Sequence, residues 1–238
     1  GIQALRLCTP QRLEGGVPTA TIRVRMFALE KEMIPILKRD LPRIFGTVHA
    51  AEEFVSGNGR PDLVFARLHD DAAPRRALPD YESLHLLVKH LNREGKVFHV
   101  DEVVGIELNR KRVLTTLDTL SQHGYLEYQD DDHFVVRRRY EPIAEEFVAI
   151  EAKLSDWKAG TYQAMRYKAF SNSAYLAIAQ EHLDKVDRSF LRSCGIGLIS
   201  VSDFGANLVL KARKNKPVSI VSNYYLSERL VNDTFFAA

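Results

Sequence analysis

The sequence predicts an α/β protein in which a mixed sheet, flanked by helices, is interrupted by a second folded segment. Three apolar runs, at 47–55, 63–68 and 143–154, have the length and composition of buried strands. A helical periodicity of apolar residues precedes the first run, at 21–46, and another helix is predicted after the third run, at 157–169. Strands and helices that alternate in this way indicate a layered α/β fold.

The second and third apolar runs are too far apart for a simple connection. Asp62 opens one run and Glu151 lies in the other, 89 residues later. Loops of that length without structure of their own are uncommon. We therefore expect residues 1–73 and 143–238 to form one discontinuous domain, with residues 74–142 folding between its two halves.

The last part of the chain predicts further elements of the same domain. Strands are expected at 174–179, 196–201 and 207–212, with a helix at 183–193. The apolar tail that follows is too rich in aromatic and aliphatic residues to be disordered. We expect it to dock either on the core or on a second copy of the chain, which would make a homodimer.

Composition limits the class of protein and its location. The 238 residues are 45% hydrophobic and 27% charged, as in soluble globular proteins, and the net charge of +2 is too small to indicate nucleic-acid binding by itself. No apolar run approaches the length of a membrane span, and no basic segment with an apolar stretch begins the chain. We expect a cytoplasmic protein without membrane contact. Its two cysteines are too few for a disulfide framework.

The stretch from Phe147 to Leu154 is predicted to be a buried strand that ends in an acid and a base. Because side chains alternate along a strand, Glu151 and Lys153 share one face. Burying such a pair is costly, since attraction returns only part of the lost hydration. The alternative interpretation is a surface ion pair where the strand reaches solvent.

Acidic and polar residues in neighbouring elements accompany this pair. Asp62 follows Pro61 at the start of a predicted strand, directly after the turn signal at 56–59. In the helix predicted at 157–169, Gln163 and Tyr167 are four residues apart and lie on one face.

The order Pro61-Asp62, then Glu151-Ala-Lys153, then Gln163 to Tyr167 resembles the motifs of the PD-(D/E)xK nuclease superfamily, also called restriction-endonuclease-like. Each motif alone is weak, and their order on strand, strand and helix carries the resemblance. It implies a restriction-endonuclease-like mixed sheet flanked by helices, and metal-dependent hydrolysis of DNA phosphodiester bonds.

The resemblance also assigns roles to individual residues. Asp62 and Glu151 would hold one or two Mg²⁺ or Mn²⁺ ions, with the Ala152 carbonyl as a further ligand. Lys153 would position the attacking water or neutralise charge in the transition state. Gln163 would support a ligand or a phosphate, and Tyr167 would pack against or orient its neighbours. No other cofactor is expected.

Glu30 is a further candidate carboxylate. It falls inside the apolar stripe of the helix predicted at 21–46, and the superfamily often uses an acid of its first helix. The alternative is that Glu30 borders the stripe and is solvated. Pro35 should bend or interrupt this helix.

Residues 74–142 have the layout of a small independent domain. Helices are predicted at 81–94, 100–107 and 109–123, followed by a hairpin of strands at 125–128 and 134–137. Three helices followed by a hairpin resemble a winged helix-turn-helix, in which the third helix would be the recognition helix.

Basic residues of this segment are concentrated at two places and would contact DNA there. They are Arg110, Lys111 and Arg112 at the start of the third helix, and Arg137, Arg138 and Arg139 at the end of the wing, that is, of the hairpin. The neutral Asn109, which caps the third helix, would contact DNA beside them. The acidic run 130–132 would repel DNA, which favours a wing that points away. A winged helix that binds protein is the alternative.

The sequence thus predicts a metal-dependent deoxyribonuclease whose winged helix positions DNA. Two other functions remain open at this point. One is a DNA-binding regulator that keeps the fold without cutting, and the other is a protein-interaction module.

Overall fold

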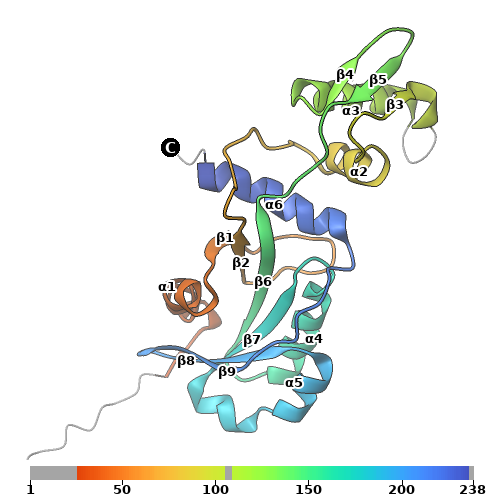
Figure 1. Cartoon of the computed structure of the whole chain (residues 1–238). Coiled ribbons are helices and arrows are strands. Elements are labelled where there is room, and N and C mark those ends of the chain that lie inside the picture. Colours follow the sequence, from red (N-terminus) through yellow and green to blue (C-terminus); the bar gives the residue numbers. More distant parts are fainter. Residues whose placement is uncertain (1–25, 105–108, 236–238) are drawn as a thin grey trace, which may run out of the picture.

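The computed structural model describes residues 26–104 and 109–235 (Figure 1). The helices and strands, in chain order, are η1 (Glu30–Glu32), α1 (Ile34–Phe45), β1 (Val48–Glu52), β2 (Leu63–Leu68), α2 (Tyr81–His90), β3 (Val97–His99), η2 (Val100–Glu102), α3 (Arg110–Gln122), β4 (Leu126–Tyr128), β5 (His133–Val136), β6 (Ala144–Lys153), α4 (Trp157–Tyr167), β7 (Ser173–Ala179), η3 (Gln180–Lys185), α5 (Arg188–Cys194), β8 (Gly197–Ser202), β9 (Gly205–Leu210) and α6 (Ile220–Phe235).

Six of these strands form one mixed sheet in the order β1-β2-β6-β7-β8-β9. The pairs β1/β2, β2/β6 and β8/β9 are antiparallel, whereas β6/β7 and β7/β8 are parallel. Helices α4 and α5 make the crossovers that parallel neighbours require. The predicted α/β class with a mixed, helix-flanked sheet is confirmed.

Strand β6 lies at the centre of the sheet and is covered on both faces. Phe147 and Ala149 pack into the apolar cluster that includes residues of α4 and α6, while Val148 and Ile150 pack into the cluster beneath α1. A strand buried on both faces has no polar alternation, which explains why this stretch is one continuous apolar run.

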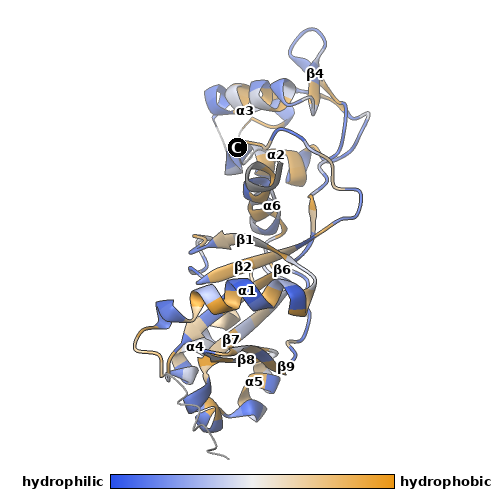
Figure 2. Cartoon of the chain, turned by 90° about the vertical axis from the view of Figure 1, so that its left-hand side faces the viewer, coloured by the Kyte–Doolittle hydropathy of each residue, from blue (hydrophilic) through white to orange (hydrophobic). Residues whose placement is uncertain are grey.

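The helix predicted at 21–46 is shorter in the structure. Residues 1–25 lie outside the described part of the chain, Glu30–Glu32 form a 3-10 turn, and α1 begins at Ile34. Pro35 occupies the first turn of α1, where its missing N–H leaves no hydrogen bond unmade. Gly46 ends the helix with φ of 63°, a conformation that favours glycine. Figure 2 shows the hydrophobic and hydrophilic residues of α1.

Residues 74–142 contribute no strand to the six-stranded sheet among the described residues. Their strands form a separate sheet in the order β3-β5-β4, which packs with α2 and α3. The third helix starts as predicted, because the Asn109 side chain accepts a hydrogen bond from the Arg112 N–H. The second predicted helix is a 3-10 turn over Val100–Glu102, and residues 105–108 of that prediction lie outside the described part.

Strand β3 was not predicted. It has three residues, of which only Phe98 is buried, so it carries too little alternation to be recognised. The helix predicted at 81–94 was too long, since α2 ends at His90. The helix predicted at 183–193 is divided in the structure into the 3-10 turn η3 and the helix α5.

Helix α6 lies between the two sheets in both views (Figures 1 and 2). Leu226, Leu230 and Val231 join the core of the six-stranded sheet, and Val221 joins the core of the smaller one. The apolar tail therefore docks within its own chain, the first of the two arrangements expected for it. Among the described residues, no helix has the length and apolar character needed to cross a membrane.

Candidate active site

The register of β2 against β6 brings Asp62 beside Glu151. Leu63 lies opposite Ile150, and the Asp62 N–H donates to the Ile150 carbonyl at 3.1 Å. Ala152, two residues after Ile150 on β6, donates its N–H to Asp62 Oδ2 at 2.7 Å. These two bonds fix the acid at the carboxyl end of β6.

Glu151 is almost completely buried, with 2% of its surface exposed. Its Oε1 accepts a hydrogen bond from Lys153 Nζ at 2.7 Å, and its Oε2 accepts one from the Tyr167 hydroxyl. Lys153 Nζ also reaches the Ala152 carbonyl at 3.2 Å and Glu30 Oε2 at 3.5 Å. The structure therefore brings together Glu30, Asp62, Glu151 and Lys153.

Burial has the largest effect on the pKa values of Glu151 and Asp62. It raises the pKa of Glu151, against the lowering effect of hydrogen bonds from Lys153 and Tyr167. Burial also raises the pKa of Asp62, more than the Ala152 N–H lowers it, and the charges of Glu30 and Glu53 add to the rise. For Lys153, burial acts to lower the pKa, but the hydrogen bond to Glu151 and the surrounding acids outweigh burial and raise it.

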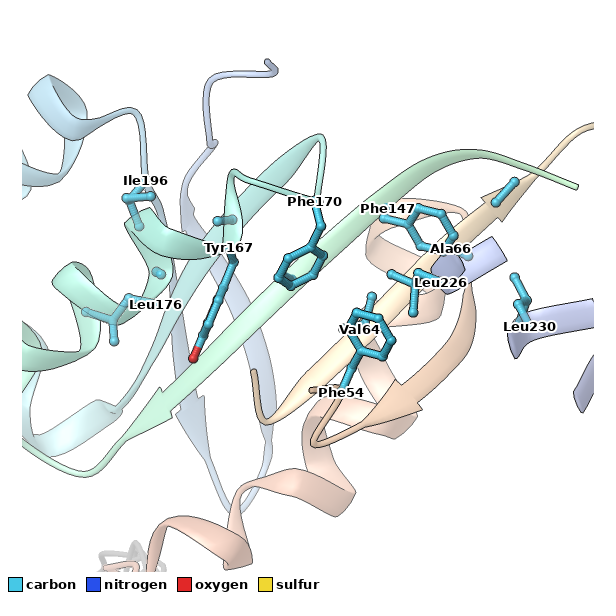
Figure 3. Close-up of a cluster of buried hydrophobic side chains, with 14 of the residues drawn as sticks. Phe54, Val64, Ala66, Phe147, Tyr167, Phe170, Leu176, Ile196, Leu226 and Leu230 are labelled. Atoms are coloured by element: carbon cyan, nitrogen blue, oxygen red, sulfur yellow. The ribbon is translucent and has the colours of Figure 1, made fainter. Parts of the chain in front are cut away.

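Helix α4 closes tightly over the site. A Cβ placed on Gly160 would lie 2.8 Å from Lys153 Cγ and 2.6 Å from Leu176 Cδ1, so the aliphatic stem of Lys153 runs beneath a position that must be glycine. Tyr167 is one of the buried aromatic residues in Figure 3. Its hydroxyl donates to Glu151 and also lies 3.1 Å from the Arg60 carbonyl oxygen.

Gln163 is not brought into this arrangement. It is half-buried on α4, and the hydrogen bonds of Asp62, Glu151 and Lys153 go to other residues. Tyr167, for which the sequence predicted only packing or orientation of its neighbours, makes the direct contact instead. The sequence pattern that pointed to Tyr167 was its four-residue spacing from Gln163. That spacing places both side chains on one face of the helix and does not show which of them contacts the strand.

An open cleft of about 740 Å³ borders the site between α1 and β1. Its lining residues include Glu30 and Asp62 together with Lys31, Lys38 and Glu53. Lys31 and Lys38 were not singled out by the sequence analysis, because lysines on the outer face of a helix are usually solvated. The cleft gives solvent and a ligand access to Asp62.

The donor set at this site fits a magnesium or manganese ion. Mg²⁺ usually keeps several waters and binds through one or two carboxylates, and the described residues contain no group of three acids, cysteines or histidines arranged for a metal. The oxygen atoms that could hold such an ion are those of the Asp62 and Glu151 carboxylates and the Ala152 carbonyl. The carboxylates of Glu30 and Glu151 both contact the ammonium of Lys153, and Asp62 lies close by, so a bound cation would offset the excess negative charge of the three acids.

The basic residues predicted to contact DNA are mostly engaged with acids of the same segment. Ion pairs join Arg110 to Asp101 and Asp132, Arg112 to Glu82, Arg137 to Glu127 and Arg139 to Glu141. Asn109 caps α3, and Arg138 lies over the Tyr125 ring. Lys111 makes no ion pair with a described residue.

No family model and no curated protein matches the sequence. A solved structure similar to this chain is SPO1766, a protein of unknown function from Silicibacter pomeroyi. The two share 14% identity with a TM-score of 0.42, over 84% of this chain and 82% of that one. A similarity of this extent carries no argument about function.

Tyr167→Phe tests the contact between α4 and Glu151. The change removes one donor and leaves a buried carboxylate oxygen unpaired, so we expect a loss of about 1–3 kcal/mol in the free energy of unfolding. Urea denaturation followed by circular dichroism measures it. Tyr162→Phe, on the exposed side of the same helix, is the matched control. If the two variants were equally stable, the hydrogen bond from the Tyr167 hydroxyl to Glu151 would contribute nothing to the stability of the fold.

Asp62→Asn should increase stability near neutral pH. The pKa of Asp62 is higher in the folded protein than in the unfolded chain, so deprotonation above about pH 4 costs folding free energy, and the amide avoids this cost. The gain should disappear below about pH 4, where the acid is protonated in both states. Urea denaturation at neutral pH and below about pH 4 measures the difference in stability between the variant and the wild type. The control is Asp184→Asn, a substitution of an exposed aspartate. A gain that is independent of pH would contradict the explanation.

Proposed function

We propose that the protein is a metal-dependent nuclease that hydrolyses phosphodiester bonds of DNA. The observation that carries the proposal is the meeting of Asp62, Glu151 and Lys153 at one end of the adjacent strands β2 and β6. This is the strand context that the PD-(D/E)xK resemblance requires, with α4 as the following helix.

Each residue of the site then has a chemical role. Asp62, Glu151 and the Ala152 carbonyl would hold a divalent cation, which when bound acidifies a water and stabilises charge on phosphate oxygens. Lys153 would place its ammonium beside that water and the scissile phosphate. Tyr167 keeps the Glu151 carboxylate oriented, and Glu30 would add negative charge at the mouth of the cleft.

The same proposal extends to the two folded segments. The six-stranded sheet would be of the restriction-endonuclease-like type, and residues 74–142 would be an inserted winged helix. The separate sheet β3-β5-β4, its packing against α2 and α3, and the Asn109 cap of α3 support this assignment.

Cleavage assays test the proposed activity. Purified protein is incubated with plasmid, linear duplex and single-stranded DNA in Mg²⁺, in Mn²⁺ or in EDTA. Cleavage in either metal that EDTA abolishes is the expected result. Binding of DNA without cleavage under any of these conditions would instead indicate a non-catalytic regulator.

A second candidate function concerns residues 74–142 alone. Because Arg110 and Arg112 already pair with acids of this segment, the start of α3 presents less free positive charge than the sequence indicates. This observation favours recognition of a protein by the winged helix. DNA would then be held by the core cleft and by the basic residues that follow β9, which are Lys211, Arg213, Lys214 and Lys216.

A triple substitution of Arg110, Lys111 and Arg112 by glutamine separates the two roles. If α3 binds DNA, duplex affinity should fall, and the salt dependence of log K should flatten by about 0.9 for each phosphate that is no longer neutralised. Fluorescence anisotropy of a labelled duplex at several salt concentrations measures both. An unchanged affinity and slope would assign DNA binding to the core and leave α3 for a protein partner.

A further inference from the structure

The base of the segment 74–142, where it joins the six-stranded sheet, contains a pocket lined by arginines. The pocket has a volume of about 610 Å³, and four of its lining residues are Arg75, Arg93, Arg138 and Arg139. An adjoining hollow of about 480 Å³ shares Arg75 and Arg138 with it. We propose that this pocket is a phosphate-binding site.

Two of the arginines are held rigidly by the protein. Arg75 pairs through both terminal nitrogens with the buried Glu228 of α6. Arg138 lies 4.2 Å from the centre of the Tyr125 ring and donates to the His123 carbonyl. Arg138 makes no ion pair with a described residue, so its charge faces the pocket without a carboxylate partner. An arginine fixed in this way loses little side-chain entropy when it binds a ligand.

The other two arginines are free to engage a ligand. Arg93 makes no ion pair with any described residue. Arg139 pairs with Glu141 at 2.8 Å, but the two side chains are 67% and 68% exposed. Exposed ion pairs stabilise a protein only weakly, so a phosphate can replace the Glu141 carboxylate as the partner of Arg139.

The charge and shape of the pocket select phosphate over other groups. Glu228 already neutralises Arg75, so the charges left to balance are those of Arg93, Arg138 and Arg139 against the two lining acids, Glu94 and Glu141. The pocket keeps an excess of positive charge. The planar fork of arginine matches the spacing of phosphate oxygens. Tyr125, the aromatic residue of the lining, is 2% exposed beneath Arg138 and offers no face on which a base could stack. The pocket therefore recognises a phosphate group rather than a nucleobase.

The phosphate can belong to a nucleic-acid backbone or to a small free molecule. The pocket lies near the Ala144 end of β6, whereas Glu151 and Lys153 lie at the other end. Ten residues of strand at about 3.3 Å each separate the two ends by about 30 Å. A duplex that reached both places would contact the pocket roughly one helical turn from the candidate active site.

The test compares two double variants that remove the same charge. Arg93→Gln/Arg139→Gln alters the pocket and spares the buried Arg75 and the stacked Arg138. The control is Arg188→Gln/Arg192→Gln on α5, which lies at the end of the molecule opposite to α2 and α3 in Figure 1. Calorimetric titration with inorganic pyrophosphate and anisotropy of a short labelled duplex, both in EDTA, are measured for the wild type and both variants.

We expect the pocket variant to bind pyrophosphate at least about tenfold more weakly than the wild type and the control. An equal loss in duplex affinity, with a lower salt slope, would identify the nucleic-acid backbone as the source of the phosphate. An unchanged duplex affinity would identify a free phosphate compound. A wild type that binds neither ligand, or identical binding by the two variants, would overturn the proposal. No step depends on cleavage, so the result is independent of the nuclease proposal.

Discussion

Lys153→Ala and Glu151→Gln should each reduce DNA cleavage by about 100- to 1000-fold, because each removes a preorganised charge from the reacting phosphate or its metal. Lys153 is the single ammonium that reaches Glu151 and Glu30 in the described part of the chain. Glutamine at position 151 keeps the acceptor for Tyr167 but loses the negative charge. Initial rates of plasmid cleavage in Mg²⁺ measure the effect.

Duplex affinity should change little in these two variants, since neither side chain lies on the exposed surface of the molecule. Glu145→Gln is a suitable control, because Glu145 is an exposed acid on the same strand and pairs with Arg67. Circular dichroism must show that the variants are folded. Wild-type cleavage rates in both site variants would refute the roles assigned to Glu151 and Lys153.

Glu228→Ala should cause the largest loss of stability, about 3–5 kcal/mol in the free energy of unfolding, because it leaves Arg75 as a buried and unpaired charge. Glu228 is 1% exposed and accepts hydrogen bonds from the Leu78 N–H at 2.6 Å and the Tyr140 hydroxyl at 2.5 Å, in addition to Arg75. These partners lie on the two connections between the sheets. The loss should therefore also increase hydrogen exchange around residues 75–78 and 140.

Further variants separate charge from packing at this site. Arg75→Leu/Glu228→Leu should recover part of the loss, since an apolar pair of similar volume avoids the buried charges. Arg139→Ala, at an exposed pair with Glu141, should change stability by at most about 1 kcal/mol. Chemical denaturation compares them. A Glu228→Ala protein as stable as the Arg139→Ala protein would show that the network does not hold the two sheets together.

The strands that carry the candidate site could be predicted because their signals are local. Asp62 follows a proline and a turn, and Glu151 and Lys153 alternate along an apolar run, so side-chain periodicity alone places them at strand ends. The end of α1 was similarly marked by Gly46. Elements with weaker local patterns were missed or misjudged, as the three-residue β3 shows.

The ion pairs made by the residues predicted to contact DNA could not be predicted from the sequence. Arg110 pairs with Asp132, 22 residues away in the turn between β4 and β5, and Arg112 pairs with Glu82 on α2. Such pairs depend on how α3 packs against its neighbours. A count of charges along the chain therefore overestimated the free positive charge at the start of α3.

By itself, the sequence determined the α/β class, the strand positions of Asp62, Glu151 and Lys153, and a folded segment between them, since hydrophobic periodicity and turn residues act over a few neighbours. Only the tertiary structure decided that Tyr167 rather than Gln163 contacts Glu151, and that α6 bridges both cores through Glu228. Those contacts join residues 16 and 153 positions apart. They arise from the packing of whole elements, which no local pattern encodes.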